Sequence, residues 1–419
     1  MRARRPTVAV AVHDGFYGCG TGAGYANDAF LRTLVELLPK HVELVLLPVH
    51  LDPDSPERDP AWYDRTRDLV ARARATVYPV HNNTDGRDRF GTLPNFRHLA
   101  EQTATVLRDR VLGTADPLVI IAFDVPFLGL SAALPRAVRP DVVLVPRSSG
   151  LIHQPEDTDR IRWETHSLLV AARHGTRIGA ISRFMRHHLR TAYGVPDAAL
   201  VDLPDGLVAT DWALTPPEDS ELPAPARSGF LLSFGRAEPY KGFADLLDAI
   251  AILRGRGRPV PHLVLAATVE GPGPTAYQRA LAERIAKFNL DATLVTRFSP
   301  EVRRLLAHPR LRGVVVPSRA EPFGRIPVEA FAAGAAPVIS TTAGGLAEQV
   351  VERITGFVAP PGDPVRLAAA LDRALALGSD QLHQLRRRAA TFAADTYDYR
   401  QTVQRFLTTT TPLLSNELA

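Results

Sequence analysis

Cysteine and lysine are scarce in this chain of 419 residues. The one cysteine, Cys19, excludes an internal disulfide bond and a zinc site built from several cysteines. Only three of the 49 basic residues are lysines, namely Lys40, Lys241 and Lys287, so a lysine inside a motif is informative. The preference for arginine, together with 35 prolines, is typical of proteins from GC-rich bacterial genomes.

Long apolar runs and a strong net charge are also missing. Asp124, two prolines and a glycine interrupt the apolar stretch Pro117–Leu134, so we expect no insertion into a membrane. The apolar run near the N-terminus is too short for a secretory signal, and we expect a cytoplasmic protein. The net charge is only +4, and no zinc-finger or RNP-like pattern is present, which argues against a nucleic-acid partner.

Short apolar runs alternate with longer amphipathic segments. This alternation predicts an α/β protein with parallel sheets that are covered by helices on both faces. The proline-rich segment Thr215–Ser228 predicts a loop or linker. We expect two Rossmann-like, doubly wound domains, residues 1–208 and 209–395, that face each other across a cleft. Residues 396–419 are expected to form a C-terminal helix or tail that packs back on the first domain.

The apolar runs locate the individual elements. Strands are predicted at Thr7–His13, Val42–Val49, Thr76–Val80, Leu118–Phe123, Val142–Val145, Arg177–Ile181, Phe230–Ser233, His262–Ala266, Thr293–Thr296, Gly313–Val316 and Pro337–Ile339. Helices are predicted at Tyr25–Leu38, Phe96–Leu112, Thr158–Ala172, Phe184–Tyr193, Phe243–Arg254, Thr275–Asn289 and Val328–Ala333.

The strongest local signal follows the buried strand that ends at Val316. Glu321 lies in the loop after this strand, and a helix is predicted to start near Ile326-Pro327 with Glu329 in its first turn. The free N–H groups of a helix start bind anions, and Gly324 allows a ligand close to the backbone. The two carboxylates can bind hydroxyls at the two ends of an elongated polyol. The alternative is that Glu329 only stabilises its own helix N-terminus.

A second signal is the strand-to-helix loop SFGRAEPYKG at Ser233–Gly242. Arg236 and Lys241 bracket this loop, and an arginine fork with a lysine point charge suits a diphosphate. The alternative is an ordinary solvated pair of cations. Because lysine is scarce in this chain, Lys241 at this position favours the diphosphate.

Glycines cluster between Gly15 and Gly24, after the first predicted strand. Gly18, Gly20 and Ala23 fit the dinucleotide fingerprint G-x-G-x-x-A. The fit is poor, because the glycines do not follow the strand directly and no acidic residue ends the second strand. A flexible loop near a diphosphate or a sugar fits this segment better.

Together these motifs resemble the retaining glycosyltransferases of family 4, the glycogen-synthase-like glycosyl transferases group 1, which have the GT-B fold. The resemblance is specific over about Phe230–Pro361. The matching motifs are Gly235-Arg236 with Pro239-x-Lys241-Gly242, Glu321-Pro322-Phe323-Gly324 with Glu329, Gly344-Gly345-Leu346 with Glu348, and Thr355-Gly356-Phe357-Val358 with Pro361-Gly362-Asp363.

The resemblance implies an enzyme that transfers a sugar from a UDP- or GDP-sugar to a hydroxyl, with retention and without a metal or other cofactor. Arg236 and Lys241 would hold the diphosphate and stabilise the leaving nucleotide. Glu321 would bind hydroxyls of the transferred sugar, and Glu329 would bind the ribose. The other donor contacts that the resemblance implies are Gly22, Gly24, Phe298, Phe323, Gly324, Arg325 and Ile326.

The chain departs from the family after the strand Val142–Val145, where many members have a histidine at the sugar. Arg147 or Ser148 stands there instead, and the nearest histidine is His153. These three residues and Asp124 are candidates on the acceptor side. The alternative for His153 is a solvated loop residue, and the alternative for Asp124 is a strand-end cap.

We expect a small soluble acceptor, such as a bacterial natural product of the aminocyclitol antibiotic type. Several alternatives stay open at this point. They are an envelope-glycan glycosyltransferase, a trehalose-type synthase or phosphorylase that uses a sugar phosphate, a non-catalytic sugar-nucleotide-binding protein, and an NAD(P) oxidoreductase.

Overall fold

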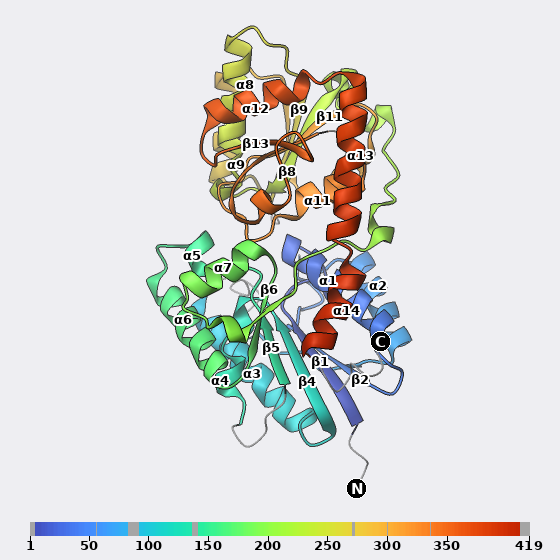
Figure 1. Cartoon of the computed structure of the whole chain (residues 1–419), viewed down its shortest axis with the longest axis vertical. Helices are drawn as coiled ribbons and strands as arrows, with labels where there is room; N and C mark the ends of the chain where they lie inside the picture. The colour runs from blue at the N-terminus through green and yellow to red at the C-terminus, as the bar shows by residue number, and fades with distance from the viewer. Residues whose placement is uncertain are drawn as a thin grey trace. The chain divides into compact units, whose positions relative to one another are not determined.

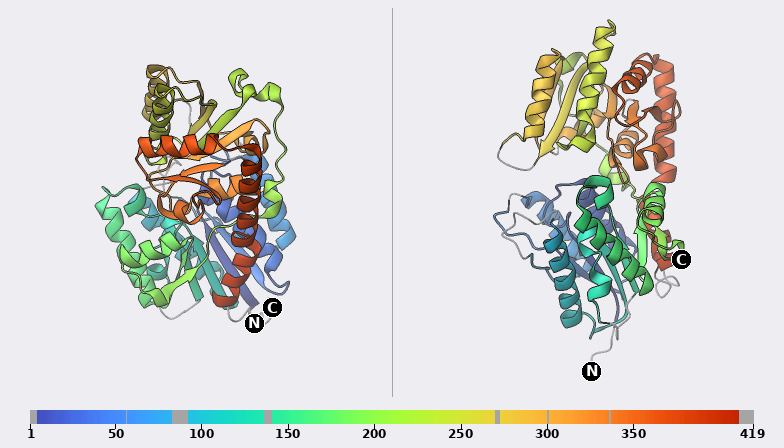
Figure 2. Two further views of the ribbon diagram at one scale, coloured as in Figure 1. Left: turned by 45° about the horizontal axis from the view of Figure 1, so that its top comes forward. Right: turned by 90° about the vertical axis from the view of Figure 1, so that its left-hand side faces the viewer.

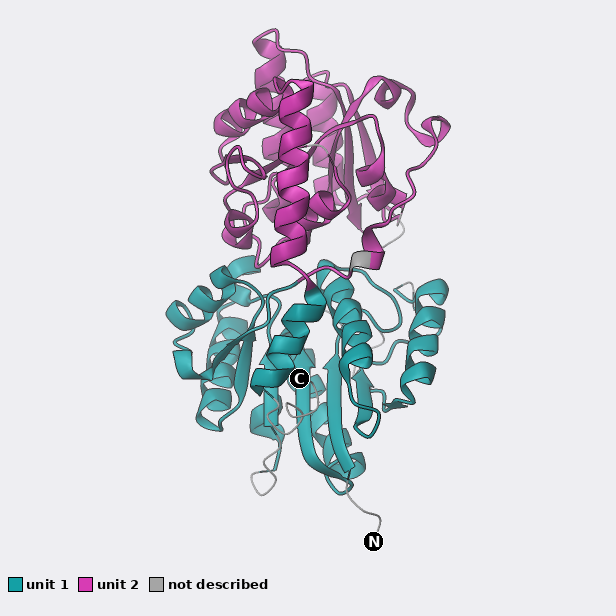
Figure 3. Cartoon of the chain, turned by 45° about the vertical axis from the view of Figure 1, so that its right-hand side comes forward, with its two compact units in different colours: residues 1–205, 399–419 teal, residues 206–398 magenta. Residues whose placement is uncertain are grey.

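The computed structural model describes residues 5–55, 57–82, 92–135, 141–269, 273–299, 301–335 and 337–410 (Figure 1). In both sheets every strand pair of these residues is parallel, and helices lie on both faces of each sheet (Figure 2). The chain divides into two compact units (Figure 3). Unit 1 comprises Met1–Asp205 and Tyr399–Ala419, and unit 2 comprises Gly206–Asp398. The boundaries expected at 208/209 and 395/396 lie three residues from these divisions.

Unit 1 contains a seven-stranded sheet in the order β3-β2-β1-β4-β5-β6-β7. The central strand β1 is buried from Val8 to Val12, as expected for a parallel strand that is covered on both faces. The order reverses between β1 and β4, and such a switch point is where open α/β sheets bind ligands. The strands are β1 (Arg5–Val12), β2 (Glu43–Pro48), β3 (Thr76–Val77), β4 (Ala115–Phe123), β5 (Asp141–Val145), β6 (Arg177–Ala180) and β7 (Leu200–Asp202).

The last helix of the described residues belongs to unit 1. In this helix, α14 (Tyr399–Thr410), Val403, Phe406 and Leu407 are buried, and this spacing gives one apolar face. That face packs against α1 (Gly22–Leu37), with the rings of Phe406 and Phe30 6.3 Å apart. The other helices of unit 1 are α2 (Pro60–Ala73), α3 (Leu93–Arg110), α4 (Leu130–Ala133), α5 (Gly150–His153), α6 (Thr158–Arg173) and α7 (Arg183–Thr191).

Unit 2 contains a six-stranded sheet in the order β10-β9-β8-β11-β12-β13, with its switch point between β8 and β11. Its core is apolar, and α8 packs against α12 over it. The strands are β8 (Phe230–Arg236), β9 (His262–Val269), β10 (Ala292–Arg297), β11 (Leu311–Val316), β12 (Val338–Thr341) and β13 (Gly356–Ala359). The helices are α8 (Phe243–Gly255), α9 (Ala276–Lys287), α10 (Glu301–Arg304), α11 (Arg325–Ala332), α12 (Pro364–Leu375) and α13 (Ser379–Thr396).

The apolar pattern did not predict α2, β7, β13, α12, α13 and the short helices α4, α5 and α10, whereas the helix expected within residues 396–419 is present as α14. Helix α2 was missed because only Trp62, Thr66 and Leu69 are buried along it. Its start depends instead on Asp59, whose side chain accepts hydrogen bonds from the backbone of Ala61 and Trp62. Among the described residues, no helix has both the length and the apolar character needed to cross a lipid bilayer.

Two loops of unit 2 pass each other very closely at Gly242. This residue has φ +68°, and a Cβ atom there would lie 2.0 Å from the carbonyl oxygen of Pro317. We expect Gly242→Ala to lower the free energy of unfolding by roughly 3 kcal/mol, measured by urea denaturation. Gly334→Ala is the matched control, because Gly334 has φ +63° but no atom within 4 Å of an added Cβ. Its expected loss is about 1 kcal/mol, and equal losses in both variants would contradict the steric explanation.

Candidate active site

The residues after β8 and β11 meet at the switch point of unit 2. Arg236 is the exposed last residue of β8, and Lys241 ends a short 3-10 turn that follows. The Nζ atom of Lys241 lies 2.5 Å from Oε1 of Glu321, and the same oxygen accepts a hydrogen bond of 2.9 Å from the Ser318 hydroxyl. The structure thus brings Lys241 and Glu321, which are 80 positions apart, into direct contact.

The charge of Lys241 is maintained by its partner. Burial works against the ammonium form, but the attraction and hydrogen bond of Glu321 outweigh it, so the pKa of Lys241 is raised. Arg236 donates a 2.7 Å hydrogen bond to the Tyr240 hydroxyl. Two permanent cations therefore stand at the end of β8, and Arg236 is the one that is exposed.

A second ion pair ties the same two loops together. The guanidinium of Arg319 binds both carboxylate oxygens of Asp245, with distances of 2.7 and 2.6 Å. The backbone N–H of Arg319 also donates to the carbonyl oxygen of Tyr240 at 2.7 Å. These contacts fix the β8–α8 turn against the loop that carries Glu321.

Helix α11 begins at Arg325, directly after Gly324, whose φ is +82°. Glu329 is the fifth residue of this helix, so the prediction that it lies in the first turn is wrong. The helix begins earlier because Pro327, as its third residue, needs no N–H partner within the helix. The Glu329 carboxylate lies 2.8 Å from Nη2 of Arg303 and 3.2 Å from Nε of Arg325. Two arginines therefore hold this buried carboxylate, which is not the contact that a helix-capping acid makes.

The remaining predicted donor contacts of unit 2 differ in their exposure. Phe298 follows β10 and is 43% exposed, so its ring is available to a ligand. Ile326 is half-buried in the first turn of α11. Phe323 is 5% exposed and packs on Tyr397 with 5.7 Å between ring centroids, so its side chain belongs to the core of unit 2. At Gly345, a Cβ would lie 2.6 Å from the Phe323 carbonyl oxygen, and Gly344 has φ +53°, so both positions of that glycine pair favour glycine.

In unit 1, Asp14 organises the glycine cluster after β1. Its carboxylate accepts hydrogen bonds from the backbone N–H of Gly15 at 2.8 Å and from the Thr21 hydroxyl at 2.6 Å. A Cβ on Gly24 would lie 2.5 Å from Oδ2 of Asp14. Gly22 and Gly24 lie in the first turn of α1 and not in a flexible loop, because Thr21 caps this helix. Asp14 was missed, although an acid directly before a glycine cluster is a usable signal.

Arg147 is turned into unit 1. Its Nε atom donates to Oδ1 of Asn27 at 2.7 Å, and its Nη1 atom pairs with Asp205. The Asn27 amide also donates to Oδ2 of Asp124 at 2.9 Å. All four side chains are buried, and the guanidinium lies 4.8 Å from the centroid of the Phe123 ring. Of the two residues predicted to replace the family's histidine, only Ser148 is partly exposed.

The two other acceptor-side candidates also differ from their alternatives. Asp124 has φ +81° and makes no capping hydrogen bond with its side chain, so it is not a strand-end cap. Burial raises the pKa of Asp124 to about 6, although the charge of Arg147 and the hydrogen bond of Asn27 oppose the shift. His153 is the half-buried last residue of α5, so its interpretation as a solvated loop residue is wrong.

The comparisons with known proteins bear on unit 2 and on the fold. Residues 216–392 match the family model described as "Glycosyl transferases group 1". The matched residues all lie in unit 2, and "group 1 domain" below denotes residues 216–392. The D-inositol 3-phosphate glycosyltransferase of Jonesia denitrificans is 33% identical over 236 residues, which are 53% of this chain and 53% of that protein. A glycogen synthase of Mycobacterium tuberculosis is 31% identical over 191 residues, 45% of this chain and 43% of that protein. The chain thus spans about half the length of the curated relatives it matches.

The solved structures that match the chain have the GT-B fold. Sucrose-phosphate synthase from Thermosynechococcus elongatus matches with a TM-score of 0.75 and 19% identity, over 99% of this chain and 100% of that chain. HepE from Anabaena, in complex with UDP-glucose, matches with a TM-score of 0.70 and 20% identity, over 98% and 99% of the two chains. The fold of this chain is therefore GT-B. Arg236, Lys241, Glu321 and Glu329 all lie within the group 1 domain.

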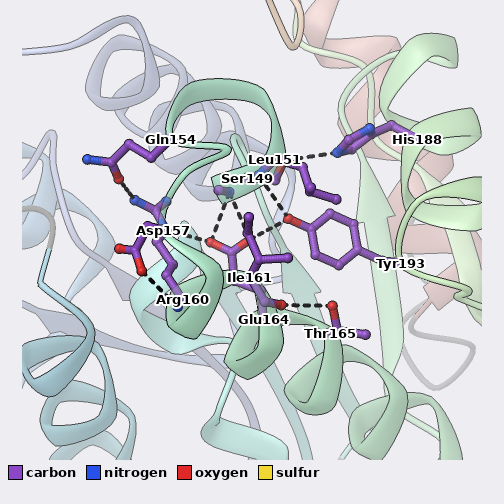
Figure 4. A network of polar contacts seen from close by, with 11 residues as sticks. Ser149, Leu151, Gln154, Asp157, Arg160, Ile161, Glu164, Thr165, His188 and Tyr193 are labelled. Carbon is purple, nitrogen blue, oxygen red and sulfur yellow. Dashed lines mark hydrogen bonds and ion pairs between the residues drawn. The ribbon is translucent and has the colours of Figure 1, made fainter.

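Outside the group 1 domain, a buried carboxylate holds the loop that follows β5 (Figure 4). Glu164 of α6 accepts hydrogen bonds from the Gly150 N–H, from Nε of Arg160 at 2.7 Å and from the Tyr193 hydroxyl at 2.5 Å. The Ser149 hydroxyl lies 2.9 Å from Nε2 of His188. This network could not be predicted from the sequence, because Gly150 and Tyr193 are 14 and 29 positions from Glu164. The network fixes the loop that carries Arg147 and Ser148.

We expect Glu164→Ala to lower the free energy of unfolding by about 3–5 kcal/mol, because Arg160 and Tyr193 would lose their shared buried partner. Tyr193→Phe removes the hydrogen bond that the hydroxyl donates to Glu164 and the one that it accepts from the Leu151 N–H, and is expected to cost about 1–2 kcal/mol. Urea unfolding followed by circular dichroism measures both losses. Losses of equal size would contradict a central role for the carboxylate.

Asp124 predicts a pH dependence of stability. Its pKa in the folded protein, about 6, lies above the ordinary value of 3.8, so the folded state binds this proton more tightly than the unfolded state. The stabilisation is complete below pH 4 and is lost as the pH rises to about 6, by an amount on the order of 3 kcal/mol. Asp124→Asn lacks this loss, which urea midpoints at pH 4, 5, 6 and 7 would show. The control Asp141→Asn, at an exposed position, keeps the wild-type dependence, and a wild-type dependence in Asp124→Asn would contradict the assignment.

Proposed function

We propose that this chain is a retaining, metal-independent glycosyltransferase that moves a sugar from a UDP- or GDP-sugar to a hydroxyl of a small acceptor. The observation that carries the proposal is the contact of Lys241 with Glu321 beside Arg236, at the switch point of the group 1 domain. A site for a nucleotide sugar needs cations for the diphosphate and an acceptor of hydrogen bonds for sugar hydroxyls. This cluster supplies both within one set of contacts.

The proposed roles follow from the charges. Arg236 and Lys241 hold the diphosphate and neutralise the charge that develops on it as the bond to the sugar breaks. Glu321 keeps one carboxylate oxygen on Lys241 and Ser318, and its carboxylate binds hydroxyls of the sugar. The bond to the acceptor oxygen forms on the face that the diphosphate leaves, and the diphosphate takes the proton of the acceptor hydroxyl.

The other donor contacts in the group 1 domain have separate proposed roles. The uncapped N–H groups at the start of α11 face phosphate oxygens, and Phe298 stacks on the nucleobase. Glu329, fixed by Arg303 and Arg325, holds the ribose.

The comparisons support the class of substrate. HepE was solved with UDP-glucose, and the relative from Jonesia denitrificans is named for D-inositol 3-phosphate, a cyclitol. We extend this to a small hydroxylated acceptor for the present chain, such as a precursor of an aminocyclitol antibiotic.

Lysine substitutions test the proposal directly. With a panel of UDP- and GDP-sugars, we expect Lys241→Ala to lower turnover at least about 100-fold, because the leaving diphosphate loses a charge contact. Lys287→Ala is the matched control, since this lysine is exposed at the end of α9. Isothermal calorimetry with UDP and GDP measures nucleotide binding separately from turnover. The proposal would be contradicted if the chain bound neither nucleotide, or if the two variants had equal turnover.

A further inference from the structure

Three strand ends bring four rings together on the β3 side of the switch point of unit 1. Tyr17 follows β1, His50 follows β2, His81 follows β3, and Tyr63 comes from α2; we name these four residues the aromatic cluster. The ring centroids of Tyr63 and Tyr17 are 5.1 Å apart, those of Tyr17 and His50 6.1 Å, and those of His50 and His81 5.2 Å. The aromatic cluster is therefore one continuous group of side chains.

The aromatic cluster is not part of the closed core of unit 1. Tyr17 is buried and supports the others, His50 and Tyr63 are half-buried, and His81 is exposed. The rings lie at the carboxyl ends of parallel strands, which is the edge where α/β sheets bind their ligands. A partly exposed group of rings at this edge suits a small molecule better than it suits the interior.

Polar atoms of the aromatic cluster and of Asn82, the residue after His81, have no hydrogen-bond partner among the described residues. Within the part of the chain that the structure describes, Nδ1 of His50 and both polar atoms of the Asn82 side chain are buried and form no hydrogen bond. The backbone N–H of His50 donates to the carbonyl oxygen of Val80 at 2.8 Å, which places the two segments side by side. Folded proteins pair nearly all buried polar atoms, so these atoms point to a partner that both donates and accepts. A hydroxyl group does both.

The two arginines beside this surface are already engaged, so they do not form an anion site. Arg67 lies 5.9 Å from the centroid of the Tyr63 ring and pairs with Asp64 at 3.3 Å. Arg58 lies 4.5 Å from the centroid of the Tyr63 ring and donates to the backbone oxygen of Leu51 at 3.3 Å, so its guanidinium is already engaged. A carboxylate oxygen of Asp52 lies 3.4 Å from Nε2 of His50. A phosphate placed among these side chains would meet this carboxylate.

We propose that the aromatic cluster and Asn82 form the acceptor subsite, and that the acceptor is a polyhydroxylated six-membered ring without a phosphate group. This inference rests on the proposed function, and it gives that function a substrate class. The C–H face of the ring packs on the partly exposed rings, and its hydroxyls pair with His50 and Asn82. An open-chain polyol has the same hydroxyls but no such face.

Saturation-transfer difference NMR on the full chain, with UDP or GDP present, tests the proposal. The probes are myo-inositol, methyl α-glucoside, the open-chain sorbitol and myo-inositol 1-phosphate. We expect saturation of myo-inositol or methyl α-glucoside, and a signal at least fivefold weaker for sorbitol and for the phosphate. Asn82→Ala and His50→Gln lower the signal of the bound ring at least fivefold. His166→Ala is the matched control, because this histidine is exposed on α6, and it leaves the signal unchanged.

The nucleotide signal in the same samples separates the two levels of the proposal. A wild-type chain that binds UDP or GDP but neither ring overturns the acceptor subsite alone, whereas a chain that binds no nucleotide overturns the proposed function as well. Ring binding that survives both Asn82→Ala and His50→Gln also overturns the subsite. Tighter binding of myo-inositol 1-phosphate than of myo-inositol overturns the exclusion of a phosphate. An unchanged nucleotide signal in each variant shows that unit 2 is still folded, and an unchanged near-ultraviolet circular dichroism spectrum shows the same for unit 1, which holds both substitutions.

Discussion

The contact between Lys241 and Glu321 is the interaction on which the site of unit 2 depends. An unpaired charge at either of these half-buried or buried positions would destabilise the fold. The ion pair offsets part of the cost of removing both charges from water. The pair holds its geometry because the two loops are fastened on either side of it. Gly242 lets the backbones touch, and Arg319 binds Asp245 across the gap. A ligand therefore meets a cation and a carboxylate whose positions are set before it arrives, which lowers the cost of orienting them.

The two units carry different charged residues at their switch points. In both, the strand order reverses next to the central strand, so the loops after two adjacent strands diverge and leave polar backbone groups to be satisfied. Unit 2 places cations there, Arg236 and Lys241. Unit 1 places Asp14 and Asp124 there, and the Asp14 carboxylate already accepts hydrogen bonds from the N–H groups of Gly15 and Gly20. The two ends thus differ in charge, and only that of unit 2 suits a diphosphate.

The parallel sheets and part of the candidate site of unit 2 could be predicted from the sequence, because both depend on local patterns. Continuous apolar runs predicted the parallel sheets. The strand-to-helix loop at Ser233–Gly242 predicted that Lys241 lies just after the end of β8. The direction of a side chain could not be predicted in the same way. Arg147 turns inward because Asp205 and Asn27, distant in sequence, bind it there, and Glu164 is buried for a similar reason. Helix α2 was missed because its start depends on one capping acid and not on apolar periodicity.

Helix α14 has a consequence for the synthesis of the protein. Its buried residues Val403, Phe406 and Leu407 complete the core of unit 1, yet they leave the ribosome after all of unit 2. Unit 2 begins and ends at one place, since Leu207 donates to the carbonyl oxygen of Tyr397 at 2.8 Å, and it forms a closed insertion in the other unit. Unit 2 can therefore fold while the chain is still being made. Unit 1, although it is translated first, keeps an open apolar face on α1 until the last helix is released.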